Sequence, residues 1–134
     1  MTDMTTSQEP QSRRALLADD DHALRTLVGQ IIHSFGFEVT HAENGKRALE
    51  LYVQAQGQFD LLITDICMPE MNGCDLIREI RRRDQKLPII AVTGYAEPEL
   101  TGELESCHVH LFEKPINFEA LHTYIDSLPN MNNL

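Results

Sequence analysis

Short apolar runs alternate along this chain with longer segments in which apolar residues recur at helical spacing. The clearest runs lie at 15–18, 59–64 and 87–92. Continuous apolarity over so few residues is typical of strands that are covered on both faces. Shorter extended segments at 37–41 and 110–112 bring the predicted strands to five.

Five segments with helical period lie between and after these strands. The strongest spans 24–35, where apolar residues recur every three or four positions and Gly36 is placed to end the helix. The others are expected at 45–55 after an Asn44 cap, around 76–80, at 97–107, and from an Asn117 cap to 128. In the second helix we expect Ala48, Leu49 and Tyr52 to face inward, with either Val53 or Ala55. The helix at 97–107 is predicted to be the weakest, because Gly102 costs about 1 kcal/mol relative to alanine.

Strict alternation of strands and helices predicts a doubly wound α/β fold, in which a parallel sheet carries helices on both faces. A chain of 134 residues suits one such domain. We place it at 13–128, with residues 1–12 as a mobile tail and 129–134 as a short C-terminal tail. In an open parallel sheet, ligands bind beyond the carboxyl ends of the strands.

Charge and cysteine content narrow the function further. A formal net charge of −10 disfavours direct binding to nucleic acid or to anionic lipid. Three cysteines without paired spacing indicate neither a disulfide framework nor a zinc site. No apolar stretch approaches the length of a membrane-spanning helix. We therefore expect a soluble cytoplasmic protein.

Reactive side chains stand at the predicted carboxyl ends of four strands: Asp19 and Asp20, Asp65, Thr93, and Lys114. Carboxylates about 4 to 5 Å apart repel each other by roughly 3 to 4 kcal/mol at an effective dielectric constant near 20, so this cluster calls for a cation. Hard oxygen ligands suit Mg²⁺, with Mn²⁺ as a second option. A free carboxylate oxygen can attack phosphorus and form an acyl phosphate, and an amine and a hydroxyl can stabilise the phosphoryl group.

Four segments together resemble the motifs of bacterial response-regulator receiver domains, the chemotaxis-regulator-like family. They are ALLADDD, LLITDICMPEMNG, IIAVTGYA and LFEKP, and the resemblance covers about 13–128. It implies a five-stranded parallel sheet in the order 2-1-3-4-5 with five helices. It also implies a switch, and not an enzyme, that accepts a phosphoryl group from the phosphohistidine of a histidine kinase.

The resemblance assigns roles to residues by position. Asp65 is the expected phosphoacceptor, and Thr93 and Lys114 are expected to contact the phosphoryl group. The expected Mg²⁺ ligands are Asp20 and Asp65, Asp19 largely through water, and the backbone carbonyl of Cys67. The bond before Pro115 is expected to be cis.

The chain departs from the family pattern at three positions. Leu111 stands where an aromatic switch residue is common, and Phe112 is expected on the opposite face of its strand. Cys67 and Tyr95 stand beside the expected path of the hydrolytic water, where neither offers a carboxamide or a carboxylate. We therefore expect a long-lived phosphorylated state.

The expected partners are a sensor histidine kinase or a histidine phosphotransfer protein, and a downstream protein that binds the fourth helix, fifth strand and fifth helix. Acidic residues on the fourth helix suggest a basic partner, and a phosphorylation-dependent homodimer is a further option. The basic run from Arg78 to Arg83 is interpreted as a solvated helix face.

Other interpretations of the chain stay open from the sequence. The expected form is a stand-alone regulator, and the alternative is a receiver cut from a larger regulator or hybrid kinase. An aspartyl-nucleophile phosphatase, a flavodoxin-like electron carrier and a degenerate scaffold receiver are the other candidate functions.

Overall fold

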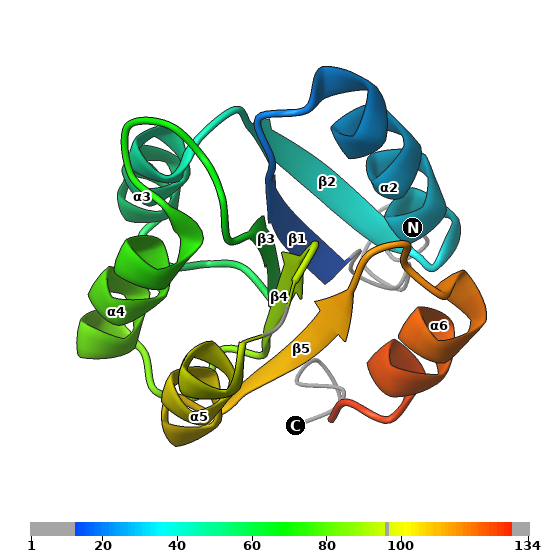
Figure 1. Cartoon of the computed structure of the whole chain (residues 1–134). Coiled ribbons are helices and arrows are strands. Elements are labelled where there is room, and N and C mark those ends of the chain that lie inside the picture. Colours follow the sequence, from blue (N-terminus) through cyan, green and yellow to red (C-terminus); the bar gives the residue numbers. More distant parts are fainter. Residues whose placement is uncertain (1–12, 96, 130–134) are drawn as a thin grey trace.

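The computed structural model describes residues 13–95 and 97–129, so the predicted tail at 1–12 and all but Pro129 of the predicted C-terminal tail lie outside it. A five-stranded parallel sheet in the order β2-β1-β3-β4-β5 forms the centre, as predicted (Figure 1). Its strands are β1 (Arg13–Ala18), β2 (Phe37–Ala42), β3 (Leu61–Asp65), β4 (Ile89–Thr93) and β5 (Val109–Glu113).

Helices cover both faces of this sheet and alternate with the strands along the described chain. They are α2 (His22–Ser34), α3 (Gly45–Gln54), α4 (Gly73–Arg83), α5 (Pro98–Ser106) and α6 (Phe118–Asp126). Buried residues of α3, α4 and α5 pack on one face of the sheet. Those of α2 and α6 pack on the other. The predicted doubly wound architecture is confirmed.

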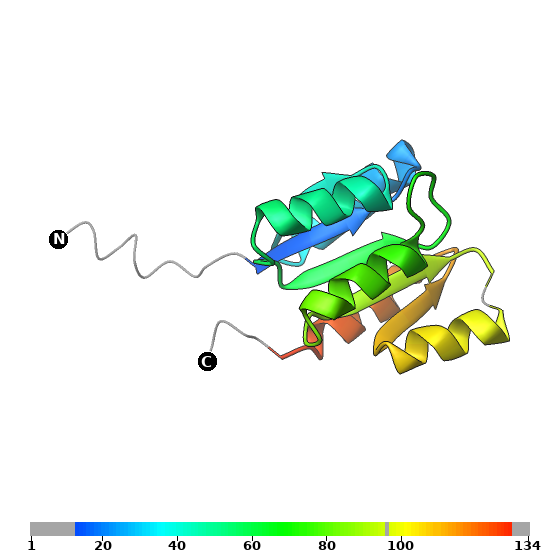
Figure 2. The ribbon, with the colours of Figure 1, turned by 90° about the vertical axis from the view of Figure 1, so that its left-hand side faces the viewer.

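The parallel register aligns the carboxyl ends of the strands at one edge. Leu17 of β1 pairs with Ile63 of β3, and Ile63 pairs with Ile90 of β4. Every residue of β3 and β4 is buried, which is why these runs are apolar without alternation. Figure 2 shows the strands side by side, all running toward the same end of the molecule.

Local capping fixes where four of the helices begin. The side chains of Asp21, Asn44, Asn72 and Asn117 each accept a hydrogen bond from a backbone N–H in the first turn of the following helix. The predicted caps at Asn44 and Asn117 are therefore confirmed. Gly36, with φ of +101°, follows the end of α2 as predicted.

The structure decides between the two residues expected at the end of the inward face of α3: Val53 is 52% exposed, and Ala55 packs against the core. Two other expectations about individual side chains are wrong. Leu27 is 46% exposed although it belongs to the apolar stripe of α2. Arg81 is half-buried and donates to the backbone carbonyls of Asp84, Leu87, Cys107 and His108, so this arginine fastens α4 to its neighbours and is not part of a solvated face.

Candidate functional site

The candidate site forms where the strand ends converge. Asp65 is the last residue of β3 and Thr93 is the last residue of β4, while Asp19 and Lys114 directly follow β1 and β5. Backbone hydrogen bonds lock these ends together. The N–H of Ile66 donates to the Val92 carbonyl, and the N–H of Lys114 donates to the Thr93 carbonyl.

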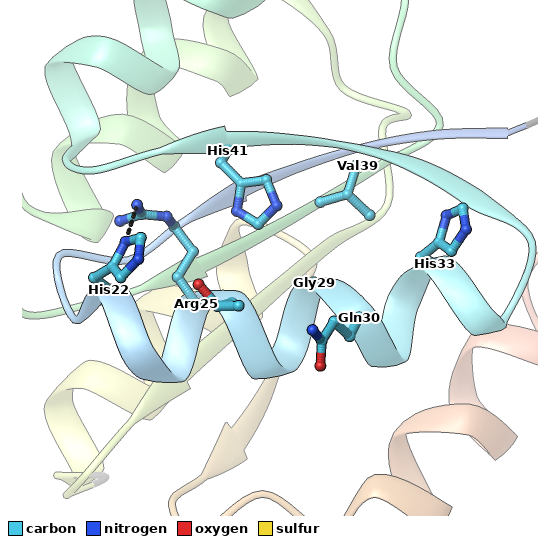
Figure 3. Close-up of a pocket in the computed structure, with 8 residues that line it drawn as sticks. His22, Arg25, Gly29, Gln30, His33, Val39 and His41 are labelled. Carbon is cyan, nitrogen blue, oxygen red and sulfur yellow. Dashed lines mark hydrogen bonds between the residues drawn. The ribbon is translucent and has the colours of Figure 1, made fainter.

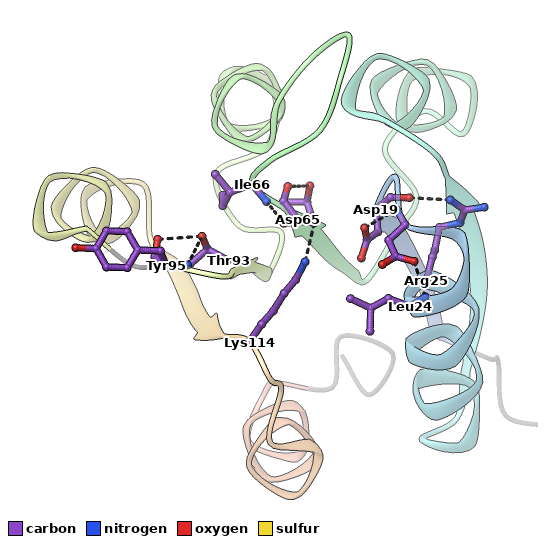
Figure 4. A network of polar contacts seen from close by, with 10 residues as sticks. Asp19, Leu24, Arg25, Asp65, Ile66, Thr93, Tyr95 and Lys114 are labelled. Atoms are coloured by element: carbon purple, nitrogen blue, oxygen red, sulfur yellow. Dashed lines mark hydrogen bonds and ion pairs between the residues drawn. The ribbon is translucent and has the colours of Figure 1, made fainter.

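Three carboxylates gather at these strand ends, as the sequence predicts. Figure 4 shows two of them, Asp19 and Asp65, at the ends of neighbouring strands. Asp19, Asp20 and Asp65 each place one carboxylate oxygen within 4.8 Å of the others. Asp19 and Asp65 are both only 6% exposed, whereas Asp20 is exposed. Two charges at that separation repel by about 3 to 4 kcal/mol at an effective dielectric constant near 20.

The crowding changes the titration of Asp19. Its pKa is raised to about 6, chiefly by burial and also by the negative charges of Asp65 and Asp20. The Asp21 N–H, which donates to Asp19 Oδ1 at 2.9 Å, and the positive charge of Lys114 act in the opposite direction. Two acidic side chains are thus held out of water beside a third. This arrangement favours a divalent cation with hard oxygen ligands.

Lys114 compensates part of the negative charge. Its Nζ donates to Asp65 Oδ2 at 3.0 Å, and the Ile66 N–H donates to Asp65 Oδ1 at 2.7 Å. Burial alone would lower the pKa of Lys114, but the Asp65 hydrogen bond and the nearby aspartates raise it, so the amine stays protonated. Both oxygens of Asp65 are therefore held by donors.

The Thr93 carbonyl accepts a hydrogen bond from the Lys114 N–H, but the Thr93 hydroxyl is bonded within its own turn. Thr93 Oγ1 donates to the Tyr95 carbonyl at 3.1 Å, and the Tyr95 N–H donates back to Oγ1 at 3.3 Å. In Figure 4 the hydrogen bonds between Thr93 and Tyr95 lie apart from the bond between Lys114 and Asp65. The sequence places Thr93 correctly at the strand end, while the direction of its hydroxyl depends on the turn.

The loop after Asp65 is packed closely against the strand end. A methyl group added at Gly73 would overlap the backbone carbonyl oxygen of Asp65, and the Gly73 N–H donates to the Ile66 carbonyl at 2.9 Å. Cys67 lies in this loop with an exposed side chain. The peptide bond between Lys114 and Pro115 is cis, as expected.

Sequence reasoning missed one side chain of the site. Arg25 on α2 donates from Nη1 to the backbone carbonyl oxygen of Asp19 at 2.7 Å, and so holds the end of β1. No sequence motif signals this contact, because it joins the first turn of a helix to the preceding strand. The expectation for Leu111 and Phe112 is confirmed, since they pack into the cores on opposite faces of the sheet.

The fold and the pocket define a doubly wound α/β protein with an acidic cluster and one paired lysine at the carboxyl edge of its sheet. The model of the response regulator receiver domain family matches residues 15–126, and the chain belongs to this family. Receiver domains are the phosphoacceptor switches of two-component systems, and they bind Mg²⁺ through acidic residues. This membership decides against the flavodoxin-like carrier.

Curated relatives include both short regulators and large kinases. The chain is 33% identical over 117 residues to the response regulator receiver protein CpdR of Brucella abortus, covering 87% of this chain and 96% of the relative. It is 31% identical to the sensor kinase CckA of the same organism, covering 87% of this chain but 12% of the kinase. It is 32% identical to the sensor protein EvgS of Escherichia coli, covering 89% of this chain and 10% of that protein.

Solved structures agree with the fold. A chemotaxis protein of Vibrio cholerae aligns with a TM-score of 0.80 at 27% identity, covering 89% of this chain and all of that one. A response regulator receiver protein of Pseudomonas putida gives the same TM-score and identity over 90% of this chain and all of that one. Within the described residues, no helix is long and apolar enough to cross a membrane.

Proposed function

We propose that this protein accepts a phosphoryl group from a phosphohistidine onto Asp65 in a Mg²⁺-dependent reaction, and that the acyl phosphate switches a partner-binding surface. The donor is a sensor histidine kinase or a histidine phosphotransfer protein, the partners of this family. The bond between Lys114 and Asp65 inside the acidic cluster is the observation that carries the proposal.

Asp65 is suited to be the nucleophile. It is buried at a strand end, and the Ile66 N–H and the Lys114 amine hold its carboxylate in one orientation. In the reaction, a carboxylate oxygen of Asp65 attacks phosphorus and the bond between phosphorus and the imidazole nitrogen breaks. The leaving imidazole keeps the electron pair and takes up a proton. Lys114 then pairs with an oxygen of the transferred phosphoryl group.

The donor set fits Mg²⁺. Asp20 and Asp65 would supply carboxylate oxygens directly and Asp19 largely through water, with the Cys67 backbone carbonyl completing the protein's share. Mn²⁺ suits the same oxygens. The ion would offset the negative charge that the carboxylates and the incoming phosphoryl group bring together. Lys114 supplies only one positive charge against three carboxylates, which supports the need for a cation.

The switch would begin at Thr93. Phosphorylation adds a charge of about −1.5 to −2 at Asp65. To donate to that group, the Thr93 hydroxyl has to leave the Tyr95 carbonyl, and this would change the turn that leads into α5. Position 111 holds a leucine that packs into the core on the α5 side, so no aromatic side chain can swing there. The conformational change would instead pass through the backbone from Thr93 to Tyr95.

The surface formed by α5, β5 and α6 is the proposed output face. Glu103 on α5 is held by Arg78 of α4. The remaining acidic residues of the α5 region, Glu97, Glu99 and Glu105, support a basic downstream partner. Stand-alone status, a cytoplasmic location, domain limits at 13–128 and phosphorylation-dependent dimers stay predictions.

The test is incubation with acetyl phosphate and Mg²⁺, followed by intact mass measurement. We expect the mass to increase by one phosphoryl group, with no increase in EDTA and none in Asp65→Asn. Asp60→Asn is the matched control, since Asp60 lies just before β3 at the opposite end and accepts a hydrogen bond from the Arg14 N–H. Labelling that survives in Asp65→Asn would refute the assignment. Multiple turnover of phosphate esters would favour the aspartyl phosphatase.

A further inference from the structure

A groove of about 590 Å³ lies between α2 and the edge strand β2, on the sheet face that α2 covers. Figure 3 shows side chains from both elements turned toward it. The lining residues are His22, Arg25, Thr26, Gly29, Gln30, His33, Val39 and His41. This volume is within the range of small-molecule sites.

The groove differs in charge from the rest of the molecule. The chain has a formal net charge of −10, yet the lining contains one arginine and three histidines and no carboxylate. Half of the six histidines of the chain thus lie on this groove. An arginine that is always protonated repels a metal cation, so the lining favours an anion.

Arg25 supplies the fixed positive charge. Its Nη1 donates to the Asp19 carbonyl and its Nη2 donates to His22 Nδ1 at 3.2 Å, so the guanidinium cannot swing freely. Its Nε is buried and has no hydrogen-bond partner in the described structure. Because arginine only donates, His22 Nδ1 is the acceptor, and the Nε2 of neutral His22 carries a proton that it can donate.

His41 forms the opposite wall of the same end. Its ring lies against α2 at Gly29, where an added Cβ would be 2.6 Å from His41 Cε1. Figure 3 shows the Arg25 guanidinium between His22 and the His41 side of the groove. At the other end, His33 Nδ1 donates to the Phe37 carbonyl at 3.1 Å, and Val39 adds an apolar surface.

We propose that this groove binds a small organic phosphate, with the phosphate group at Arg25, His22 and His41 and the organic part over Gly29 toward Val39. Each Nη of Arg25 has a second N–H beyond the bonds to Asp19 and His22, and these two donors with two imidazole donors would recognise phosphate oxygens. The other end accepts an uncharged body. Arg25 also holds the Asp19 carbonyl, but Asp65, Thr93 and Lys114 take no part in the groove, so the inference does not rest on the proposed function.

Phenyl phosphate is the probe, titrated without Mg²⁺ into labelled protein while amide and imidazole NMR signals are followed. We expect saturable shifts at residues of α2 and β2, complete by about 10 mM, which corresponds to a weak site. Benzyl alcohol, which has the ring without the phosphate, should not shift the Arg25 and His22 signals. A protein of net charge −10 repels anions in general, so saturation would mark a specific site.

Two variants separate the site from a purely structural arginine. Arg25→Lys keeps the charge but loses the fork, and we expect phenyl phosphate to bind at least about tenfold more weakly. His41→Gln leaves the contact between Arg25 and Asp19 in place and should also weaken binding. His122→Gln, a change on α6, should not. The proposal would be overturned if the shifts never saturate or if benzyl alcohol gives identical shifts. It would also be overturned if Arg25→Lys and His41→Gln bind phenyl phosphate as tightly as the unchanged protein does.

Discussion

The raised pKa of Asp19 makes a quantitative prediction about metal-free protein. Asp19 is buried beside Asp65, and its pKa of about 6 lies well above the 3.8 that is usual for an aspartate in water. The folded state therefore binds a proton more tightly than the unfolded state does. Well below pH 3.8 Asp19 is protonated in both states, and the stabilisation associated with its protonated form is fully present. As the pH rises through 6, the folded state must accept a buried charge and that stabilisation is lost.

The size of the loss follows from the shift. One pKa unit corresponds to 1.36 kcal/mol, so a shift of two units is worth about 3 kcal/mol. Replacing Asp19 with asparagine removes the charge and keeps the shape. We therefore expect Asp19→Asn in EDTA to be more stable than the unmodified protein at pH 7.5, by up to about 3 kcal/mol, and nearly equal to it at pH 4.

Urea unfolding of both proteins in EDTA from pH 4 to pH 7.5 measures this difference. Burial lowers the pKa of His41 and of His110, which makes stability rise with pH, but both proteins share this contribution and it cancels in the difference. Mg²⁺ at pH 7.5 should then stabilise the unmodified protein more than Asp19→Asn. Parallel stability curves with no divergence between pH 4 and pH 7.5 would refute the reasoning.

Three further predictions concern the loop and the chemistry. Gly73→Ala forces a methyl group onto the Asp65 carbonyl and should lower the free energy of unfolding by about 2 kcal/mol or more. At Gly102 on α5 an added methyl group meets nothing within 4 Å, so Gly102→Ala should raise the free energy of unfolding by about 0.5 to 1 kcal/mol. Thermal melts of the pair check this, and equal losses would contradict the packing argument. Cys67→Asn should hasten loss of phosphate from Asp65 in Mg²⁺ buffer, because a carboxamide can orient water; an unchanged decay rate would count against it. Lys114→Gln should slow labelling by acetyl phosphate by about tenfold or more, since the paired amine is lost, and an unaltered initial rate would remove Lys114 from the mechanism.

Helix caps, apolar runs and the alternation of strands with helices predict most of the fold from the sequence. The Asn44 and Asn117 caps act within one turn of their own helices, so the sequence reveals them directly. Fully apolar runs identify β3 and β4 because both faces of these strands are covered. Leu27 is an exception among the apolar residues of α2. It stays 46% exposed because the apolar stripe of α2 is wider than the face that packs on the sheet.

The candidate site is predictable in its membership but not in its internal contacts. Parallel strands bring Asp19, Asp65 and Lys114 to one edge whatever the loops do, so their convergence follows from topology. The hydroxyl direction of Thr93 and the contact from Arg25 to the Asp19 carbonyl depend on turn geometry and on how α2 lies against β1. The pKa of Asp19 depends on burial, which no spacing rule supplies.

The position of the acyl phosphate tests the central claim most directly. After incubation with acetyl phosphate and Mg²⁺, borohydride reduces an aspartyl phosphate to homoserine, which peptide mass spectrometry locates. We predict homoserine at position 65, with Asp19 and Asp20 unchanged although they lie within 4.8 Å of it. Homoserine at position 19 or 20, or phosphorylated protein that yields no homoserine, would contradict the account.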